Sequence, residues 1–317
     1  MSAVAVVDAL REKGHEVLAV GIAKDGSWHM ADPDTRPLSA RGREAVFEMP
    51  AGVLRSGDDR YRFDVAFPVL HGPFGEDGTV QGMFEMAGMP YVGSGVVGSA
   101  VAMDKDVAKR LFRDAGLAIS PFITIRADGF AEDPAGITAR VRTELGYPVF
   151  VKPAELGSSV GISRADDDGS FKDAVHEAFR HGAKVVVESE VVGREIEVAV
   201  LEGPRASVPG EIVVAGWYTY DAKYQDDATE LLVPAPLSDA AAAMVREMAK
   251  RAFTVLECRG LARVDFFYEE DGRGFIINEI NTMPGFTPKS MFPMMWAATG
   301  MSYPDLCDEL VSLALER

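Results

Sequence analysis

The sequence has little cysteine and no long apolar run. Two cysteines, Cys258 and Cys307, occur among the 317 residues, and their spacing matches no metal-ligand motif. No segment approaches the roughly 18–20 consecutive apolar residues that a membrane-spanning helix needs. Residues 1–10 lack the basic stretch and the cleavage site of a signal peptide. We therefore expect a cytoplasmic protein with two inert thiols and no membrane contact.

Basic residues are also scarce relative to acidic ones. The chain has 32 lysines and arginines against 49 aspartates and glutamates, which gives a net charge of -17. A surface of this sign repels a polyphosphate backbone, so nucleic acid is not an expected partner. An anionic ligand must instead be held by a few local lysines and arginines, by backbone N–H groups or by metal ions.

The composition that remains, 47% hydrophobic and 26% charged, is that of an ordinary folded protein. Strand and helix patterns alternate from the start: a helix over 3–12 and apolar strands over 16–22 and 64–70 favour an α/β fold. A chain of this length exceeds the size at which one core usually stops growing. From the changes in pattern near Gly93 and Ser189, we expect three domains, at 1–93, 94–188 and 189–317.

A glycine- and serine-rich loop, 155–162, joins two apolar strands and can offer several backbone N–H groups to phosphate oxygens. Lys152 stands at the end of the preceding strand, where a cation is costly unless it meets an anion. Lys105, in a helix, is a second candidate. A tight hairpin with two surface lysines is the alternative, because no Walker A lysine follows the loop and no helix begins there.

Two alternating strands near the C-terminus carry the strongest polar pattern. Alternation places Arg263 and Asp265 on one face of the first strand, and Glu279 and Asn281 on one face of the second. If the turn between them is the three residues 271–273, Asp265 lies opposite Glu279 and Arg263 lies opposite Asn281. A two-residue Asp-Gly turn would shift the register by one and split the cluster. We expect the three-residue turn.

Facing carboxylates among apolar neighbours repel one another unless a divalent cation bridges them. Two Mg²⁺ ions, held by Asp265, Glu279 and Asn281 together with substrate phosphates, fit this pattern. The alternative is an amphipathic hairpin whose polar residues face solvent. Directly after the hairpin, a rigid turn offers the N–H of Gly285 and the hydroxyl of Ser290, which beside an arginine can form an oxyanion site.

Two further segments offer groups that could bind a ligand. The polar, aromatic stretch 217–231 has the features of a lid, with Lys223 and Tyr224 at its middle. The segment 188–195 follows an apolar strand and can hydrogen-bond adenine through its backbone and ribose through Glu195. A plain surface loop and an interdomain linker are the alternatives.

Taken in order, eight strings of the sequence resemble the D-alanine:D-alanine ligases of the ATP-grasp superfamily: HGPFGEDG, MDK, VFVKP, GSSVGIS, ESEVVGREIE, YDAKY, LARVDFF and NEINTMPGFTPKSMFP. The resemblance covers residues 64–317, and the joint order and spacing of the strings make it specific. It implies an ATP-grasp fold preceded by an N-terminal parallel α/β domain.

The resemblance also implies a role for each candidate residue. Those at ATP would be Lys105, Lys152, Gly157, Ser158, Ser159, Val160, Glu188, Val191, Glu195 and Lys223. Those at two Mg²⁺ or Mn²⁺ ions would be Asp265, Glu279 and Asn281. The catalytic residues would be Arg263, Ser158, Tyr224 and Gly285, and those at the amino-acid substrates His71, Lys223 and Ser290.

The implied reaction transfers the γ-phosphate of ATP to the carboxylate of one D-alanine, after which the amine of a second D-alanine displaces phosphate. The dipeptide would serve peptidoglycan synthesis, and a homodimer is expected. By the same resemblance, Tyr224 hydrogen-bonded toward Ser158 would favour an amine over D-lactate as the second substrate. The alternatives are an ATP-binding homologue without ligase activity and a ligase that uses D-lactate or D-serine.

Two positions depart from the family pattern. The family begins with a strand and a Gly-Gly-x-Ser-x-Glu loop, whose glutamate contacts the amino group of the first substrate, whereas this chain starts within the first helix, at 1–4. We therefore expect a truncated form with absent or reduced ligase activity. Lys289 stands where many relatives have histidine or a neutral residue, which would alter the pocket for the second substrate.

Overall fold

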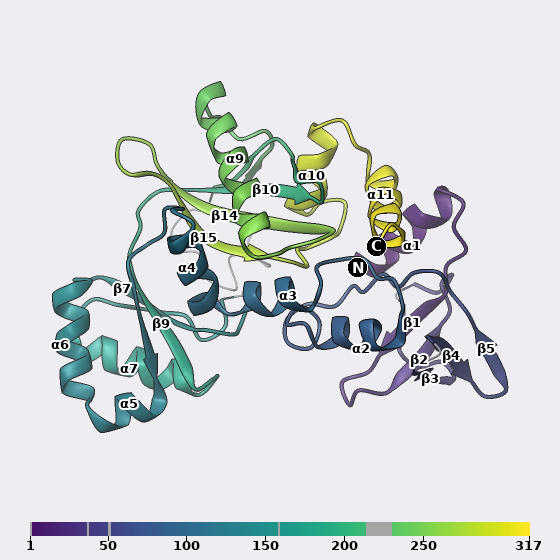
Figure 1. Ribbon diagram of the computed structural model, residues 1–317, viewed down its shortest axis with the longest axis horizontal. Coiled ribbons are helices and arrows are strands. Elements are labelled where there is room, and N and C mark those ends of the chain that lie inside the picture. Colours follow the sequence, from purple (N-terminus) through teal and green to yellow (C-terminus); the bar gives the residue numbers. More distant parts are fainter. Residues whose placement is uncertain (1, 37, 50–51, 158, 214–229) are drawn as a thin grey trace.

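The computed structural model describes residues 2–36, 38–49, 52–157, 159–213 and 230–317. The molecule is elongated and contains three sheets: a five-stranded sheet near one end, a six-stranded sheet in the middle and a four-stranded sheet at the other end (Figure 1). Three of the predicted site residues, Ser158, Lys223 and Tyr224, lie outside the described residues.

The N-terminal region consists of a helix followed by an antiparallel sheet whose strands are adjacent in chain order. The elements are α1 (Ser2–Glu12), β1 (Ala19–Ile22), β2 (Trp28–Ala31), β3 (Glu44–Glu48), β4 (Val53–Ser56) and β5 (Asp59–Tyr61). Helix α2 (Thr79–Ala87) packs against this sheet through Phe84, whose ring meets that of Phe47 edge-on at 5.8 Å between centroids.

The predicted strand over 64–70 is wrong, because a single bridge at Ala66 stands in place of the whole strand. Only Ala66 makes a bridge there, parallel to Tyr91, with hydrogen bonds of 2.9 Å from Ala66 N to Pro90 O and from Val92 N to Ala66 O. Pro68 has no N–H to donate, so it ends the pairing. The described five-stranded sheet is antiparallel, and this single bridge is the parallel pairing that the region retains.

The four-stranded sheet is antiparallel and has helices on one face. Its strands run in the order β6 (Phe122–Arg126), β9 (Lys184–Ser189), β7 (Val149–Pro153) and β8 (Ser163–Ala165), and the helices are α5 (Ala127–Glu132), α6 (Pro134–Glu144) and α7 (Asp168–Phe179). Val151 and Val187 are buried against Phe171 of α7. Because strand side chains alternate, Lys152 and Glu188 lie on the opposite face of the sheet.

The six-stranded sheet has helices on both faces. Its strands run in the order β13 (Glu230–Leu232), β12 (Gly210–Val213), β10 (Arg194–Leu201), β14 (Leu261–Glu269) and β15 (Gly274–Asn281), with β11 (Arg205–Ala206) beside β10. Val198 and Val200 pack toward α9 (Asp239–Val255), whereas Ala199 and Leu201 pack toward α10 (Met291–Ala298) and α11 (Tyr303–Leu315). Because helices cover both faces of the sheet, this part of β10 has apolar residues on both faces.

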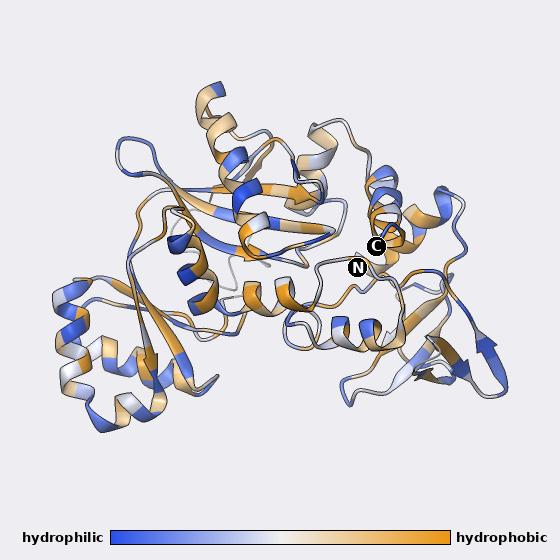
Figure 2. Cartoon of the chain, viewed as in Figure 1, coloured by the Kyte–Doolittle hydropathy of each residue, from blue (hydrophilic) through white to orange (hydrophobic). Residues whose placement is uncertain are grey.

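Helices α3 (Val96–Met103) and α4 (Lys105–Asp114) connect the N-terminal region to the four-stranded sheet. Their apolar residues, including Ala102 and Phe112, belong to the core of the six-stranded sheet, and α3 is apolar along most of its length (Figure 2). The predicted domain boundaries stay predictions. None of the described helices has the length and apolar character that a bilayer span requires.

The first and last helices pack together, so the N-terminal region depends on the C-terminal helix. Leu306 of α11 is fully buried beside Val6 and Leu10 of α1. We expect Leu306→Ala to lower the free energy of unfolding by about 2–5 kcal/mol, because the cavity forms where two regions meet. The matched change Leu315→Ala, on the same helix but 48% exposed, is expected to cost about 0.5 kcal/mol or less. Urea unfolding measures both, and equal costs would contradict the packing described.

Candidate active site

The polar hairpin pairs as predicted at its functional end. Asp265 of β14 lies opposite Glu279 of β15, and Arg263 lies opposite Asn281. All four polar side chains therefore come from facing positions, and the alternative in which the register splits the cluster is excluded.

The predicted turn is wrong, although the predicted pairing is right. Glu269 pairs with Gly274, so the turn comprises the four residues 270–273 rather than three. A β-bulge compensates for this difference: Phe266 pairs with Ile277, and Asn278 is the extra residue. The alternation of side chains and the turn sequence do not reveal such a bulge, because it lies several residues from the turn and leaves the turn sequence unchanged.

Arg263 is held by two carboxylates inside the sheet. Its guanidinium donates two hydrogen bonds of 2.7 Å to the Asp265 carboxylate, and its Nε is 3.1 Å from Oε2 of Glu197 on β10. Asn281 Nδ2 donates to Asp265 Oδ2 at 2.8 Å. Burial alone would lower the pKa of Arg263, but the charges of Asp265 and Glu197 raise that pKa well above its usual range. Arg263 is therefore a fixed, permanently charged group.

The same hairpin has the donor types that Mg²⁺ prefers. Two carboxylates, Asp265 and Glu279, and the amide oxygen of Asn281 come from directly paired positions. In the described part of the chain, no three His, Cys, Asp or Glu side chains group together as a metal site. The donor types on the hairpin fit metal ions that take their remaining ligands from phosphate and water, which is the usual mode of Mg²⁺.

Two lysines converge on one buried glutamate across from the hairpin. Glu188 Oε2 lies 3.2 Å from Lys152 Nζ and 3.3 Å from Lys109 Nζ, and Glu188 is 3% exposed. Burial opposes its ionisation, but Lys109 and Lys152 outweigh burial and hold the pKa of Glu188 below its usual value. Sequence reasoning missed Lys109, although its position one helical turn after Lys105 was a usable indication.

Two lysines, Lys105 on α4 and Lys152 on β7, contact the β14–β15 hairpin of the six-stranded sheet. Lys105 Nζ donates to the carbonyl oxygen of Leu156 at 2.6 Å and is 3.5 Å from Glu279 Oε2. Lys152 Nζ donates to Asn278 Oδ1 at 3.3 Å. Helix α4 lies between the four-stranded sheet and the β14–β15 hairpin, which is why its lysines reach both (Figure 1).

The glycine- and serine-rich loop follows β7 directly and turns through left-handed backbone conformations. Ser159 has φ 57° and Gly161 has φ 71°. A Cβ at Gly161 would lie 2.6 Å from His181 Cδ2, so glycine is required there. Gly157 and Val160 are joined by a long hydrogen bond of 3.3 Å between Val160 N and Gly157 O. Val191, on the segment between β9 and β10, and Glu195, in β10, are only partly buried.

The motif that contains His71 lies beside the C-terminal turn. His71 Nδ1 is 3.1 Å from the carbonyl oxygen of Met283. Glu76, which sequence reasoning quoted within the motif but did not select, accepts a hydrogen bond of 2.7 Å from Gly72 N. Burial, and to a smaller extent the charge of Glu279, raise the pKa of Glu76 to about 7. A carboxyl that titrates near neutrality is thus electrostatically coupled to the hairpin.

Gly285 and Ser290 lie next to each other in this turn. Gly285 is exposed, and a Cβ on it would be 3.2 Å from Ser290 Oγ. The Ser290 hydroxyl is 2.8 Å from Thr287 Oγ1 and accepts a hydrogen bond from Thr287 N at 3.1 Å. The structure therefore brings the predicted N–H and hydroxyl together.

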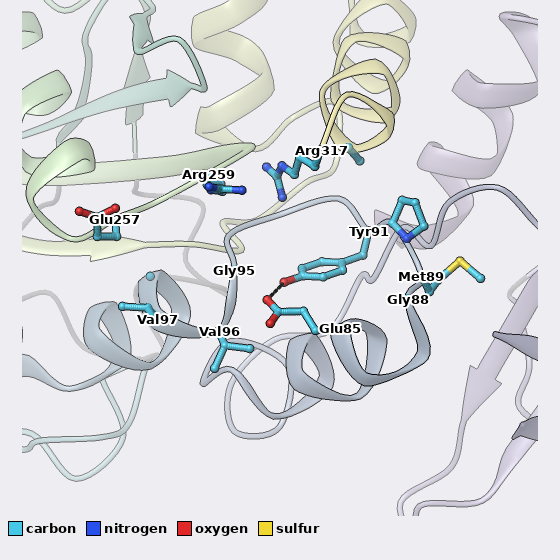
Figure 3. Close-up of a pocket in the computed structure, with 13 residues that line it drawn as sticks. Glu85, Gly88, Met89, Tyr91, Gly95, Val96, Val97, Glu257, Arg259 and Arg317 are labelled. Atoms are coloured by element: carbon cyan, nitrogen blue, oxygen red, sulfur yellow. Dashed lines mark hydrogen bonds between the residues drawn. The ribbon is translucent and has the colours of Figure 1, made fainter. Parts of the chain in front are cut away.

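A cavity of about 670 Å³ lies apart from all of these residues. Glu85, Tyr91, Arg259 and Arg317 line it, and the Tyr91 hydroxyl donates to Glu85 at 2.9 Å (Figure 3). None of the residues predicted from sequence lines this cavity, so its size does not make it the reaction site.

Comparison with known proteins gives consistent matches along the chain. A family model described as D-ala D-ala ligase N-terminus matches residues 1–94, and one described as D-ala D-ala ligase C-terminus matches residues 111–312. The D-alanine:D-alanine ligase of Pseudarthrobacter chlorophenolicus is 46% identical over an alignment that covers all of this chain and 90% of the relative.

Solved structures agree with the fold. The D-alanine-D-alanine ligase from Coxiella burnetii has a TM-score of 0.87 and 34% identity, covering 100% of this chain and 89% of its own. The VanG D-Ala:D-Ser ligase from Enterococcus faecalis has a TM-score of 0.87 and 31% identity, covering 99% of this chain and 94% of its own. The predicted ATP-grasp fold class is confirmed. With both family models matched and a relative at 46% identity over the whole length, the chain belongs to the D-alanine:D-alanine ligase family.

Proposed function

We propose that this ATP-dependent ligase joins two D-alanine molecules where the β14–β15 hairpin faces the four-stranded sheet. The observation that carries this placement is the pair of contacts across the junction, Lys105 Nζ to Glu279 Oε2 at 3.5 Å and Lys152 Nζ to Asn278 Oδ1 at 3.3 Å. Cations that suit phosphate thus lie beside oxygen ligands that suit Mg²⁺.

ATP would lie along the face of the four-stranded sheet that carries Lys152 and Glu188, opposite its helices. Glu188 Oε1 is buried and has no hydrogen-bond partner among the described residues, so it is an acceptor available to the exocyclic amine of adenine. The backbone at Val191 would continue the adenine contact, and Glu195 would accept from the ribose hydroxyls. The phosphates would be bound by Lys105, Lys152 and the loop residues Gly157, Ser158, Ser159 and Val160, with Lys223 closing from the lid.

The metal ions would be two Mg²⁺ or Mn²⁺ held by Asp265, Glu279 and Asn281. When bound, they would neutralise the charge of the phosphates and align them for transfer. Arg263 supports this site as a fixed cation, because its two hydrogen bonds to Asp265 orient that carboxylate. These residues hold phosphate and substrate in position, which supplies much of the acceleration in phosphoryl transfer.

The proposed reaction has two steps. A carboxylate oxygen of the first D-alanine attacks the γ-phosphorus, the bond to ADP breaks, and an acyl phosphate forms. The amine nitrogen of the second D-alanine then attacks the acyl carbon, loses a proton, and inorganic phosphate leaves. Arg263 and the exposed N–H of Gly285 would stabilise the oxyanion of the tetrahedral intermediate.

The amino-acid substrates would lie between the His71 motif and the C-terminal turn. His71 would lie near the first D-alanine, and Ser290 with Lys223 would bind the carboxylate of the second. Ser158 and Tyr224 would orient the reacting groups. We propose D-alanine as the second substrate, and product analysis with D-alanine, D-serine and D-lactate tests this, since a preference for either of the latter two would contradict it.

In the cell, the dipeptide would supply peptidoglycan precursor synthesis in the cytoplasm, where ATP is available. We propose a homodimer as the working form. Met86 and Val97, on α2 and α3, are 73% and 61% exposed, and a second copy would cover such apolar side chains. Analytical ultracentrifugation at micromolar concentration tests this, and a monomer would contradict the proposal.

The metal assignment gives a direct test in Glu279→Gln. This change keeps the volume of the side chain but removes a charged oxygen ligand, so phosphate release is expected to fall by at least about a hundredfold while the fold is retained. Asp271→Asn in the hairpin turn is the matched control and should be almost silent. Phosphate release is measured with D-alanine and ATP across Mg²⁺ concentrations. Near-native turnover of Glu279→Gln at saturating Mg²⁺ would exclude the metal role.

The raised pKa of Glu76 predicts how the free energy of unfolding changes with pH. Below about 4.5 this carboxyl is protonated in both states, whereas between there and about 7 the native protein keeps a proton that the unfolded chain releases. Its contribution to stability is therefore fully present at low pH and is lost as pH rises through 7. The free energy of unfolding of the native chain minus that of Glu76→Gln should fall by about 3 kcal/mol over this window. Urea unfolding at each pH measures the difference.

The exposed helix residue Glu132 provides the control for this series. The change Glu132→Gln should track the native chain at every pH. Parallel pH profiles for the native chain and Glu76→Gln would show that Glu76 has an ordinary pKa.

A further inference from the structure

Lys109 is a buried ammonium group for which the proposed reaction has no role. Its side chain is 2% exposed, and its Nζ lies 3.3 Å from Glu188 Oε2. Among the described residues, Nζ has no partner that meets hydrogen-bond geometry. The ring of Phe122 lies 5.8 Å from Nζ and provides a second, weaker attraction.

The position does not require a lysine for packing. Ala108 and Phe112, its neighbours on α4, are buried and apolar. A methionine of similar length would fill the same space without the cost of removing an ammonium from water. The charge is therefore the property that distinguishes lysine from an apolar residue here.

The two lysines that share Glu188 are not equivalent. Lys152 is 9% exposed, stands at the start of the glycine-rich loop and also contacts Asn278, so in the proposed function it turns toward the phosphates of ATP. Lys109 is 1% exposed and contacts Glu188 from α4. When phosphate attracts Lys152, Lys109 is the counter-ion that remains with Glu188.

We infer that Lys109 is a positioning residue for ATP recognition, which keeps the Glu188 carboxylate ionised and oriented while Lys152 binds phosphate. Glu188 Oε1 then stays an anionic acceptor for the exocyclic amine of adenine. Guanine has a carbonyl oxygen at that place, which an anionic carboxylate repels. The inference rests on the proposed function, because it assumes that Glu188 contacts adenine.

The charged groups around Glu188 set the expected pH dependence. Lys109 approaches from α4 and Lys152 from β7, and Phe122 and Phe150 are its uncharged strand partners. Burial raises the pKa of Glu188, and the two lysines lower it. Removing Lys109 should therefore raise the pKa of Glu188 and make ATP binding weaken as pH falls.

The test is Lys109→Met in the full chain. Affinity for a non-hydrolysable ATP analogue is measured by calorimetry, and the ligase reaction by phosphate release between pH 6 and pH 8. We expect the KM for ATP to rise about tenfold at pH 7, with kcat within about twofold of the native value. The KM should also rise further toward pH 6, and the preference for ATP over GTP should fall.

Arg113→Met is the matched control. Arg113 lies on the same helix, and its guanidinium is 5.7 Å from the same Phe122 ring, but it is exposed and has no contact with Glu188 in the described structure. Its removal should leave ATP affinity and its pH profile unchanged.

Glu188→Gln separates this inference from the proposed function. If Lys109 acts through Glu188, Lys109→Met should cost nothing further in the Glu188→Gln background. An unchanged KM for ATP in Glu188→Gln would overturn the adenine contact itself. A raised KM in Glu188→Gln with a native KM and pH profile in Lys109→Met would overturn only the role of Lys109.

A second variant covers the case in which Lys109→Met does not fold. If Lys109→Met lacks the native circular dichroism spectrum, Lys109→Gln, whose amide can donate to Glu188, takes its place with the same readouts. Unfolding of both variants would overturn the inference, because Lys109 would then be required for the fold and not for ATP recognition.

Discussion

The pairing of three buried lysines, Lys105, Lys109 and Lys152, with the carboxylates of Glu188 and Glu279 is the constraint on which the rest of this structure depends. Lys105 lies on a helix that packs on one sheet, yet its ammonium bridges the loop of the other sheet and Glu279. Charges in a low-dielectric interior are tolerated only when paired. Each buried lysine must therefore lie where a carboxylate or a carbonyl oxygen can reach it, and this requirement limits how the two sheets can be arranged.

This arrangement depends on the simplest property of a strand, its alternation. In β7 and β9 the residues facing the helices are valines, while Lys152 and Glu188 face the other way. In β10 the residues 198–201 are apolar on both faces because helices cover both. In the four-stranded sheet, alternation therefore puts the core valines on one face and the charged residues Lys152 and Glu188 on the other. In the six-stranded sheet, it supplies apolar side chains to two cores, one on each face.

Much of the fold and the site could be predicted from sequence, because period-2 and helical patterns determine which side chains share a face. Such patterns placed Asp265 and Glu279 on facing strands, and their direct pairing was predicted correctly only because the bulge at Asn278 offset the wrong turn length. The raised pKa of Glu76 and the contact of Lys109 with Glu188 were not predicted, since they depend on burial and on neighbours distant in sequence. The strand at 64–70 was overextended because apolar composition outweighed the effect of Pro68 on pairing.

The bulge at Asn278 has a consequence for how the hairpin tolerates change. It divides the β14–β15 ladder into an outer part next to the turn, where residues 266–269 pair with 274–277, and an inner part, where residues 263–265 pair with 279–281. An added or deleted residue at the tip can be accommodated by repairing the outer part alone, while Asp265 and Glu279 keep their partners. The bulge therefore separates the exposed turn from the paired carboxylates, and a change of pairing confined to the turn leaves Asp265 opposite Glu279.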